Sequence, residues 1–353
     1  MVENRYLSFF KNKRIFITGN TGFVGSNISI TLNLLDAKIL GYSLKKRDKK
    51  YISNSQEYKK KFTTIYDDIN NIGKHTHIIK KFKPQILIHL ASQPIVKESF
   101  DRPLKTFESN IIGTIKLLEV VKKIKTLKNI LIFTSDKVYK NYENTTLNEK
   151  SPLGGDDPYS SSKSAQDIIS NSFKESFFKT SKNIFIIRAG NIIGGGDWEK
   201  SRLIPDLFIS NNIKKNILLR NSKAIRPWQH IYDVINAILK LISKKGRVIN
   251  PKSFTYNIGP KNNNKIRVID LIVRFFKLSK FLKIKYKFTK IKFSEKKYLK
   301  ISSKLFIKDI KWKPKLNLNN SIKLTRDWYF NFYKDKKNIY NFTEKQIKFF
   351  LNL

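Results

Sequence analysis

Short apolar stretches recur along the first half of the chain, and most of them are rich in β-branched residues. The runs at residues 13–18, 38–42, 86–90 and 129–134 have the length and the Ile, Leu and Phe content of buried strands. Helix-compatible segments separate them, beginning with residues 24–35. Because strands that alternate with helices build parallel sheets covered on both faces, this pattern predicts a doubly wound parallel α/β fold.

The second half of the chain lacks this regular alternation. We expect residues 1–190 to form the domain that carries the parallel sheet, and residues 191–353 to form mainly a smaller, interleaved lobe. Some later segments should return to the sheet. A length of 353 residues suffices for one large α/β unit and such a lobe. The tail at 329–353 could form an amphipathic helix that packs against the body or a partner.

A glycine-rich turn follows the first predicted strand. Gly19, Gly22 and Gly25 are spaced three residues apart, and the predicted helix at 24–35 begins within their run. Glycines let the backbone approach a pyrophosphate, and the helix N-terminus offers free N–H groups to it. The order strand, glycine turn and helix therefore predicts a Rossmann-type site for a dinucleotide cofactor.

The end of the second predicted strand should decide between NAD and NADP. NAD sites usually carry Asp or Glu at this position, but this chain has Ser43, which can hydrogen-bond a ribose hydroxyl. The cations Lys45, Lys46 and Arg47 follow and suit a 2′-phosphate, so this chemistry alone leaves both cofactors open. For Asp68 and Ile69 a solvated turn is an equal alternative. Further cofactor contacts are expected at Thr21, Phe23, Val24, Asp68, Ile69, Leu90, Ala91 and Gln93.

Tyr159 and Lys163 are four residues apart in a helix-compatible segment and should share one helix face. A phenol has a pKa of about 10, and a nearby ammonium lowers it. Tyr159 could then take a proton from a sugar hydroxyl, while Lys163 also holds the nicotinamide ribose. Ser135, which follows the strand at 129–134, would hydrogen-bond the same sugar oxygen.

Asp136 and Lys137 supply acid/base chemistry that a plain dehydrogenase or epimerase does not need. A carbonyl at one sugar carbon makes the neighbouring C–H acidic. Lys137, if partly deprotonated by burial, could remove that proton, and Asp136, if protonated, could protonate the departing hydroxyl. The alternative is a surface ion pair at a strand end.

These motifs and others resemble the extended short-chain dehydrogenase/reductase superfamily and, more closely, its CDP-glucose 4,6-dehydratase family. The resemblance covers nearly the whole chain. It rests on F-F-K-N-K-R-I-F-I-T-G-N-T-G-F-V-G (9–25), G-Y-S-L (41–44), H-L-A-S-Q-P (89–94), T-S-D-K-V-Y (134–139), P-L-G-G-D-D-P-Y-S-S-S-K (152–163), R-A-G-N-I-I-G-G-G-D-W (188–198), R-L-I-P-D (202–206), A-I-R-P-W-Q-H (224–230) and W-K-P (312–314). The last several separate this family from dTDP-glucose dehydratases and UDP-sugar epimerases. The chain departs from the family at 294–297, where Ser-Glu-Lys-Lys replaces a His-Glu-Ala run.

The resemblance implies an NAD-dependent hydro-lyase that converts CDP-glucose to CDP-4-dehydro-6-deoxyglucose, a precursor of deoxysugars for surface polysaccharide such as the lipopolysaccharide O-antigen. Tyr159 and Ser135 would oxidise C4, Asp136 would protonate the 6-hydroxyl, and the hydride would return to C6. Relatives acting on dTDP-glucose have Glu where this chain has Lys137, so the identity of the C5 base is open. The alternative is an epimerase, decarboxylase or dehydratase acting on a dTDP- or UDP-sugar.

Four residues of the second half are candidates for binding the substrate. Arg202 and Arg226 suit the diphosphate, because the forked guanidinium matches phosphate geometry. Asn191 is expected at a phosphate or sugar oxygen, and His230 at the nucleotide. For each of them a structural role in loop packing is the alternative.

The net charge of +44 is extreme and would ordinarily suggest a nucleic-acid partner. The lysines are spread along the whole chain, however, and we expect no nucleic-acid binding. The absence of Cys excludes disulfides and thiolate ligands, and four scattered His residues give no metal site. No apolar run approaches the roughly 20 residues of a membrane span, and residues 1–10 lack a signal-peptide core. We expect a cytoplasmic homodimer or homotetramer.

Overall fold

The computed structural model describes most of the chain. The described residues are 6–46, 48–140, 145–246, 254–260, 266–279, 285–289 and 297–352. Arg47, one of the three predicted cations after the second strand, lies outside these ranges, as do residues 294–296 of the family departure.

Seven parallel strands form the central sheet of the described residues, in the order β10-β6-β5-β4-β1-β2-β3. The strands are β1 Arg14–Thr18, β2 Lys38–Ser43, β3 Thr63–Tyr66, β4 Ile86–His89, β5 Asn129–Phe133, β6 Asn183–Ala189 and β10 Thr255–Ile258. The chain order reverses between β1 and β4, which makes the topological switch point of a Rossmann-type sheet. The predicted α/β fold class is confirmed.

Alternate residues of the strands feed two separate cores. In β1, Ile15 and Ile17 belong to one buried cluster and Phe16 belongs to the other. Both faces of the sheet therefore need a helical layer, as the continuous apolar strands predicted.

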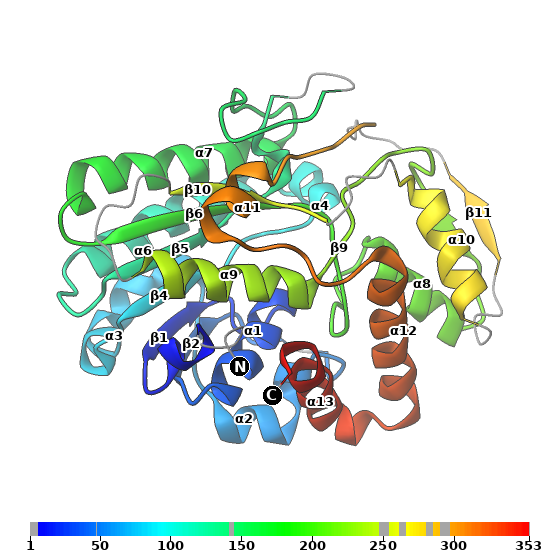
Figure 1. Ribbon diagram of the computed structural model, residues 1–353, viewed down its shortest axis with the longest axis horizontal. Coiled ribbons are helices and arrows are strands. Elements are labelled where there is room, and N and C mark those ends of the chain that lie inside the picture. Colours follow the sequence, from blue (N-terminus) through cyan, green and yellow to red (C-terminus); the bar gives the residue numbers. More distant parts are fainter. Residues whose placement is uncertain are drawn as a thin grey trace.

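Helices cover both faces of this sheet (Figure 1). One cluster includes residues of α1 Phe23–Leu34, α9 Ile231–Lys245 and α13 Ile339–Leu351. The other includes residues of α3 Thr76–Phe82, α6 Gly113–Lys122 and α7 Pro158–Phe173. The shorter helices are α2 Gln56–Lys61, α4 Val96–Asp101, α5 Pro103–Phe107 and α11 Lys304–Ile310.

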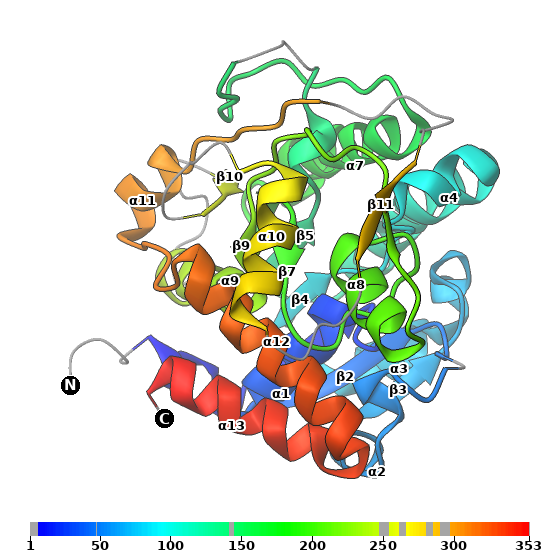
Figure 2. The same ribbon diagram turned by 90° about the vertical axis from the view of Figure 1, so that its right-hand side faces the viewer.

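A smaller group of elements stands beside the sheet, at the right of Figure 1, and faces the viewer in Figure 2. It contains α8 Leu203–Asn212, α10 Val268–Leu278, α12 Leu318–Lys334, β8 Ile217–Leu219 and β11 Tyr286–Phe288. A short pair, β7 Ile192–Ile193 with β9 Gln229–His230, joins it to the sheet. Strand β10 and helix α9 come from the second half of the chain yet pack in the sheet body. The division of the chain at residue 190 stays a prediction.

The tail differs from the single helix that its pattern suggested. It forms the end of α12 and the separate helix α13, because the chain turns at the 3₁₀ segment Lys336–Asn338. Trp328 of α12 packs against Gly195, where a Cβ would lie 2.0 Å from the indole ring. The hydroxyl of Tyr329 donates to the carbonyl oxygen of Asp197. Helix α12 thus supports the loop at 194–202 from behind.

Among the described residues, no helix is both long and apolar enough to cross a membrane.

Candidate active site

A cavity of about 430 Å³ opens at the carboxyl ends of the central strands, where open α/β sheets bind their ligands. Its walls come from the turn after β1, from the ends of β2, β4, β5 and β6, and from the first turn of α7. The loop at 197–206 and residues of β8 close the side next to the smaller lobe. Most of the predicted catalytic and cofactor residues therefore meet in a single hollow.

The turn after β1 brings backbone to the cavity without side chains in the way. Gly19 has a φ of +75°, a region that favours glycine, and a Cβ on it would lie 2.7 Å from the Ala91 nitrogen. Gly25 lets α1 pack on this turn, since its Cβ would lie 2.0 Å from the Gly19 carbonyl oxygen. Helix α1 begins at Phe23, and its N-cap Gly22 has no side chain to occupy the first N–H groups. The turn fits the diphosphate of a dinucleotide.

The end of β2 lies beside this turn, and the residues after it contact Glu199 in the second half of the chain. Ser43 lines the cavity, and its Oγ lies 2.6 Å from Thr21 Oγ1. Lys46 Nζ lies 2.6 Å from Glu199 Oε1, and the Tyr51 hydroxyl donates to the same oxygen at 3.0 Å. Burial raises the pKa of Glu199, but Lys46, Arg202 and Tyr51 together bring it below its ordinary value, so this carboxyl is ionised. The charge of Lys46 is therefore largely neutralised.

The turn after β5 carries the acid/base residues. Ser135 Oγ accepts from the Lys137 backbone nitrogen at 3.2 Å and donates to Asp136 Oδ1 at 3.1 Å. Asp136 is 2% exposed, and only glycine fits at the neighbouring position 190, where a Cβ would lie 2.5 Å from Asp136 Oδ2. Tyr159 hydrogen-bonds to Ser135, and Lys137 Nζ lies 5.8 Å from the centre of the Tyr159 ring. Tyr159 and the predicted acid/base pair Asp136 and Lys137 thus line one surface.

Helix α7 begins directly before Tyr159. Asp157 caps it by accepting from the Ser160 backbone nitrogen at 2.9 Å, and a proline occupies its first position. Tyr159 and Lys163 therefore stand one turn apart, and both line the cavity, as their spacing predicted. Lys163 Nζ donates to Gln166 Oε1 at 2.9 Å.

Burial decides how Tyr159 and Lys163 titrate. It raises the pKa of Tyr159 to about 12, although Ser135 and Arg202 each lower it somewhat. Burial also lowers the pKa of Lys163 to about 7. The expectation that Lys163 brings the Tyr159 pKa below its ordinary value is therefore wrong for the protein without cofactor. Lys163 is already neutral at the pH where the phenol ionises, so desolvation wins.

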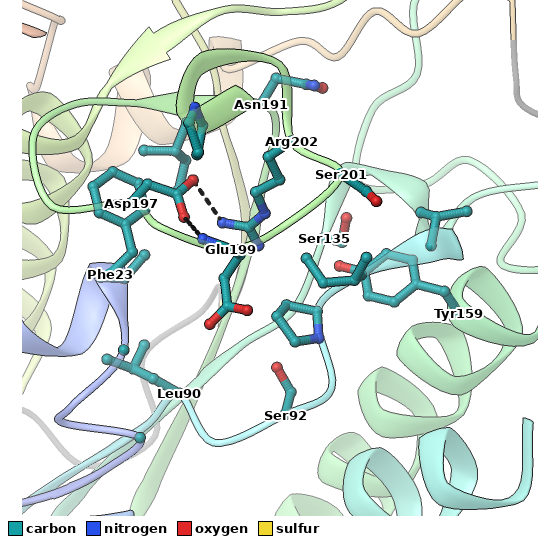
Figure 3. Close-up of a pocket in the computed structure, with 18 of the residues that line it drawn as sticks. Phe23, Leu90, Ser92, Ser135, Tyr159, Asn191, Asp197, Glu199, Ser201 and Arg202 are labelled. Carbon is teal, nitrogen blue, oxygen red and sulfur yellow. Dashed lines mark hydrogen bonds and ion pairs between the residues drawn. The ribbon is translucent and has the colours of Figure 1, made fainter. Parts of the chain in front are cut away.

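A charged arginine stands opposite the catalytic tyrosine. Arg202 Nη1 lies 3.0 Å from Asp197 Oδ2, and Asp197 Oδ1 accepts from the Glu199 backbone nitrogen at 3.2 Å. Figure 3 shows Arg202 and Asp197 on one side of the cavity, across from Ser135 and Tyr159. Burial lowers the pKa of Arg202, but Asp197, Glu199 and Tyr159 together raise it above its ordinary value, so the guanidinium stays charged. Such a fixed cation suits an anionic substrate.

Most of the predicted site residues line the cavity. They are Gly19, Gly22, Phe23, Val24, Gly25, Ser43, Asp68, Ile69, Leu90, Ala91, Ser135, Asp136, Lys137, Tyr159, Lys163, Asn191, Arg202 and Arg226. The sequence reasoning missed other charged lining residues, namely Lys97, Asp197, Glu199, Asp206 and Arg220. Asp197 and Asp206 stand inside the quoted motifs at 188–198 and 202–206, but no role in the site had been assigned to either.

Three predicted site residues do not line the cavity: Thr21, Gln93 and His230. The side chain of each is hydrogen-bonded to another group of the protein. Thr21 turns to Ser43. Gln93 Nε2 donates to Thr106 Oγ1 at 2.8 Å. His230 Nδ1 accepts from a backbone nitrogen in the first turn of α9, and burial lowers the pKa of His230 to about 3.

Comparison with known proteins places this arrangement in a family. The family model described as GDP-mannose 4,6 dehydratase matches residues 16–325. The chain belongs to the GDP-mannose 4,6-dehydratase family. Among curated proteins, the chain is similar to the CDP-glucose 4,6-dehydratase of Salmonella typhimurium, which is 34% identical over 273 residues, 75% of this chain and 76% of the relative. The CDP-paratose 2-epimerase of Salmonella typhi is 26% identical and covers 89% of this chain and 98% of its own length.

Solved structures share the fold of this dehydratase family member. The dTDP-glucose 4,6-dehydratase of Bacillus anthracis, solved in complex with NAD, superposes with a TM-score of 0.76 at 23% identity. It covers 93% of this chain and 99% of its own. The epimerase Mth375 of Methanothermobacter thermautotrophicus reaches a TM-score of 0.82 at 18% identity, over 93% and 95% of the two chains. The expected class, a nucleotide-sugar 4,6-dehydratase of the hydro-lyase type, agrees with the family.

Proposed function

We propose that this protein is an NAD-dependent CDP-glucose 4,6-dehydratase. One observation carries the proposal: Tyr159, Asp136 and Lys137 line the same cavity, so oxidation at one sugar carbon and elimination at the next can occur without release of the substrate. Family membership and the 34% identical CDP-glucose 4,6-dehydratase support this choice of substrate.

The cavity fits NAD better than NADP. The backbone of the turn at 19–25 receives the diphosphate, and Ser43 meets the ribose at the end of β2. The ion pair with Glu199 withdraws Lys46 from a 2′-phosphate. NAD⁺ would supply the acceptor for the hydride of C4 and its later return to C6, and its nicotinamide ring would add a positive charge to the cavity.

Tyr159 acts first, at the C4 hydroxyl of the glucose. Its phenolate oxygen takes the hydroxyl proton while the C4–H bond breaks, and C4 becomes a ketone. Ser135, hydrogen-bonded to Tyr159, holds the same sugar oxygen. Positive charge from a bound NAD⁺ would lower the pKa of Tyr159 from its value in the free protein.

Asp136 and Lys137 then remove water across C5 and C6. The C4 ketone acidifies the C5–H bond, and Lys137, partly buried beside the Tyr159 ring, takes that proton. The C6–O bond breaks as Asp136 delivers a proton to the leaving hydroxyl, which departs as water. After reduction at C6, a proton returns to C5, and the product is CDP-4-dehydro-6-deoxyglucose.

The remaining contacts serve the nucleotide. Arg202 and Arg226 bind the diphosphate, and Asn191 holds a phosphate or sugar oxygen; all three line the cavity. A homodimer or homotetramer, a cytoplasmic location and a role in deoxysugar supply for surface polysaccharide belong to the same proposal.

The test is turnover of the purified protein with NAD⁺ and CDP-glucose, read as the alkali-induced absorbance of a 4-keto sugar. dTDP-glucose, UDP-glucose and GDP-mannose serve as parallel substrates. Signal with CDP-glucose alone is expected. Signal only with another nucleotide would move the substrate assignment, and no signal with any of them would refute the dehydratase assignment.

A second experiment separates dehydration from oxidation. Asp136→Asn and Lys137→Met should still reduce bound NAD⁺ on addition of CDP-glucose, seen at 340 nm, but should form at least 100-fold less 6-deoxy product. Lys140→Met, at an exposed lysine three residues further on, is the matched control and should behave as the wild type. Normal product formation by Lys137→Met would remove Lys137 as the C5 base.

A further inference from the structure

A chain of buried side chains connects Lys163 on α7 with Thr18 at the end of β1. Lys163 Nζ donates to Gln166 Oε1, and Gln166 Nε2 donates to Thr114 Oγ1, both at 2.9 Å. Thr114 Oγ1 lies 3.0 Å from His89 Nε2, and His89 Nδ1 lies 2.6 Å from Thr18 Oγ1. None of the five residues is more than 3% exposed. The catalytic lysine and the cofactor turn are therefore linked through the interior.

The hydroxyl of Thr114 fixes the direction of every bond in this chain. It donates its single proton to the Asn110 carbonyl oxygen at 2.8 Å. Thr114 Oγ1 is therefore an acceptor for both other neighbours, Gln166 Nε2 and His89 Nε2. His89 carries its proton on Nε2, so Nδ1 accepts from the hydroxyl of Thr18. All of these polar groups are satisfied when His89 is neutral.

The state of His89 agrees with this assignment. Burial and, to a lesser extent, the nearby charge of Lys163 together lower the pKa of His89 to about 3. Thr18 Oγ1 in turn accepts from the backbone nitrogen of Ala91 at 3.3 Å, next to the glycine turn. The chain thus ends on the backbone that receives the cofactor.

We propose that Gln166 is a positioning residue that holds Lys163 by its carbonyl oxygen and sets the proton affinity of this lysine. Thr114 and His89 act through Gln166. Because Thr114 Oγ1 can only accept from Gln166, the amide nitrogen of Gln166 faces Thr114 and its carbonyl oxygen faces Lys163. The proposal rests on the proposed function only in that it takes Lys163 as catalytic.

The neighbours of Lys163 explain why Gln166 has this influence. Gln166 Oε1 and the Phe133 carbonyl oxygen, at 3.4 Å, hold Lys163 in the described part of the chain, and both are neutral. His89 of β4 also lies near Lys163 and is neutral. Tyr159 precedes it by one turn of α7, and Asp136 and Lys137 stand beyond Tyr159. Since burial works against the ammonium, the acceptor at residue 166 has a large share in deciding whether Lys163 is charged near pH 7.

Two substitutions of Gln166 should move the titration of Lys163 in opposite directions. Gln166→Met removes the acceptor and should shift the midpoint down by about one pH unit. Gln166→Glu, of nearly the same shape, sets a carboxylate against Lys163 and should shift it up by at least as much. Lys163 is read on its own peptide by mass spectrometry, as the pH dependence of acetylation by acetic anhydride in the NAD-bound protein without substrate.

Ser170→Ala is the matched control, since Ser170 lies one turn further along α7 and bonds only to the Gln166 backbone oxygen among the contacts described. Its midpoint should equal that of the wild type. If Gln166→Met does not fold, the upward shift in Gln166→Glu still decides the question. Midpoints that stay at the wild-type value, or move the same way in both variants, would overturn the proposal.

Turnover gives an independent reading. The alkaline limb of the kcat profile with CDP-glucose should follow the acetylation midpoint in each variant, because Tyr159 needs the ammonium of Lys163. A limb that stays fixed while the midpoint moves would show that Gln166 does not act on catalysis through Lys163. If the wild type turns over no nucleotide sugar, the proposed function fails, whereas the acetylation result still decides the role of Gln166.

Discussion

Arg188 of β6 donates hydrogen bonds to both carboxylate oxygens of Asp167 on α7, with Nε–Oδ2 at 2.7 Å and Nη2–Oδ1 at 2.8 Å. The two side chains are 5% and 4% exposed. Burial lowers the pKa of Arg188, but Asp167 raises it by more. This pair ties the helix of Tyr159 and Lys163 to the strand that leads to Asn191.

Breaking this pair should destabilise the protein more than removing it whole. Asp167→Asn leaves the Arg188 charge buried without its partner and should cost about 3 kcal/mol in unfolding free energy, measured by urea denaturation. The double variant Asp167→Asn with Arg188→Met should recover part of this loss. A loss below about 1 kcal/mol in the single variant would show that the pair is energetically minor.

Loss of the Tyr159 hydroxyl should abolish the first chemical step. Tyr159→Phe is expected to lower kcat by about 10²–10⁴-fold, because proton transfer from the C4 hydroxyl then lacks its base. Bound NAD per protomer should not change. Tyr333→Phe is the control, since that hydroxyl donates to the Phe208 carbonyl oxygen outside the cavity wall. A Tyr159→Phe enzyme with more than a tenth of the activity would assign the base elsewhere.

The ion pair between Lys46 and Glu199 should discriminate between the two dinucleotides. Glu199→Gln frees the Lys46 charge for a 2′-phosphate, so NADP should gain several-fold in affinity relative to NAD. The readout is competition between the two cofactors for apoprotein. Adding Lys46→Met should cancel the gain; an unchanged preference in Glu199→Gln would mean that Lys46 does not meet the adenosine ribose.

Lys163 should make the stability of the apoprotein depend on pH. Its pKa falls from 10.5 to about 7 on folding, so the unfolded chain binds more protons between these values and stability rises with pH there. Lys163→Met removes this term. The stability of Lys163→Met relative to wild type should therefore be greatest near pH 6.5 and shrink by an amount on the order of a few kcal/mol by pH 10. A difference that is the same at both pH values, by urea denaturation, would contradict the burial of a titrating Lys163.

The sequence predicted those parts of the site that depend on neighbours along the chain. The glycine turn and the Tyr159–Lys163 spacing are local signals, since strand, turn and helix fix where those residues point. Glu199 escaped prediction because its partner Lys46 stands 153 positions earlier. Asp197 pairs with the nearby Arg202, but it lies in a loop that Tyr329, 132 positions later, holds in place. No local pattern records which distant loops will meet.

Distant contacts also explain why Thr21 and Gln93 do not line the cavity, and why the pKa of Tyr159 is raised where lowering was expected. Thr21 and Gln93 stand in the right loops, but their side chains bond to Ser43 of β2 and to Thr106 of α5. The direction of the Tyr159 pKa depends on how deeply the ring is buried, a tertiary property. Position along the sequence locates a residue, whereas packing decides its rotamer and its charge.

Because Trp328 and Tyr329 support the loop at 194–202, the parts of the site can form only in a certain order during synthesis of the chain. Strands β1 to β6 leave the ribosome first and can assemble the cofactor turn and the tyrosine. The wall that carries Asp197 and Arg202 gains its backing only after α12 has been synthesised, more than 120 residues later. A nascent chain halted before Trp328 thus lacks the contacts of Trp328 with Gly195 and of Tyr329 with Asp197, so this wall of the cavity is supported only after α12 has been made.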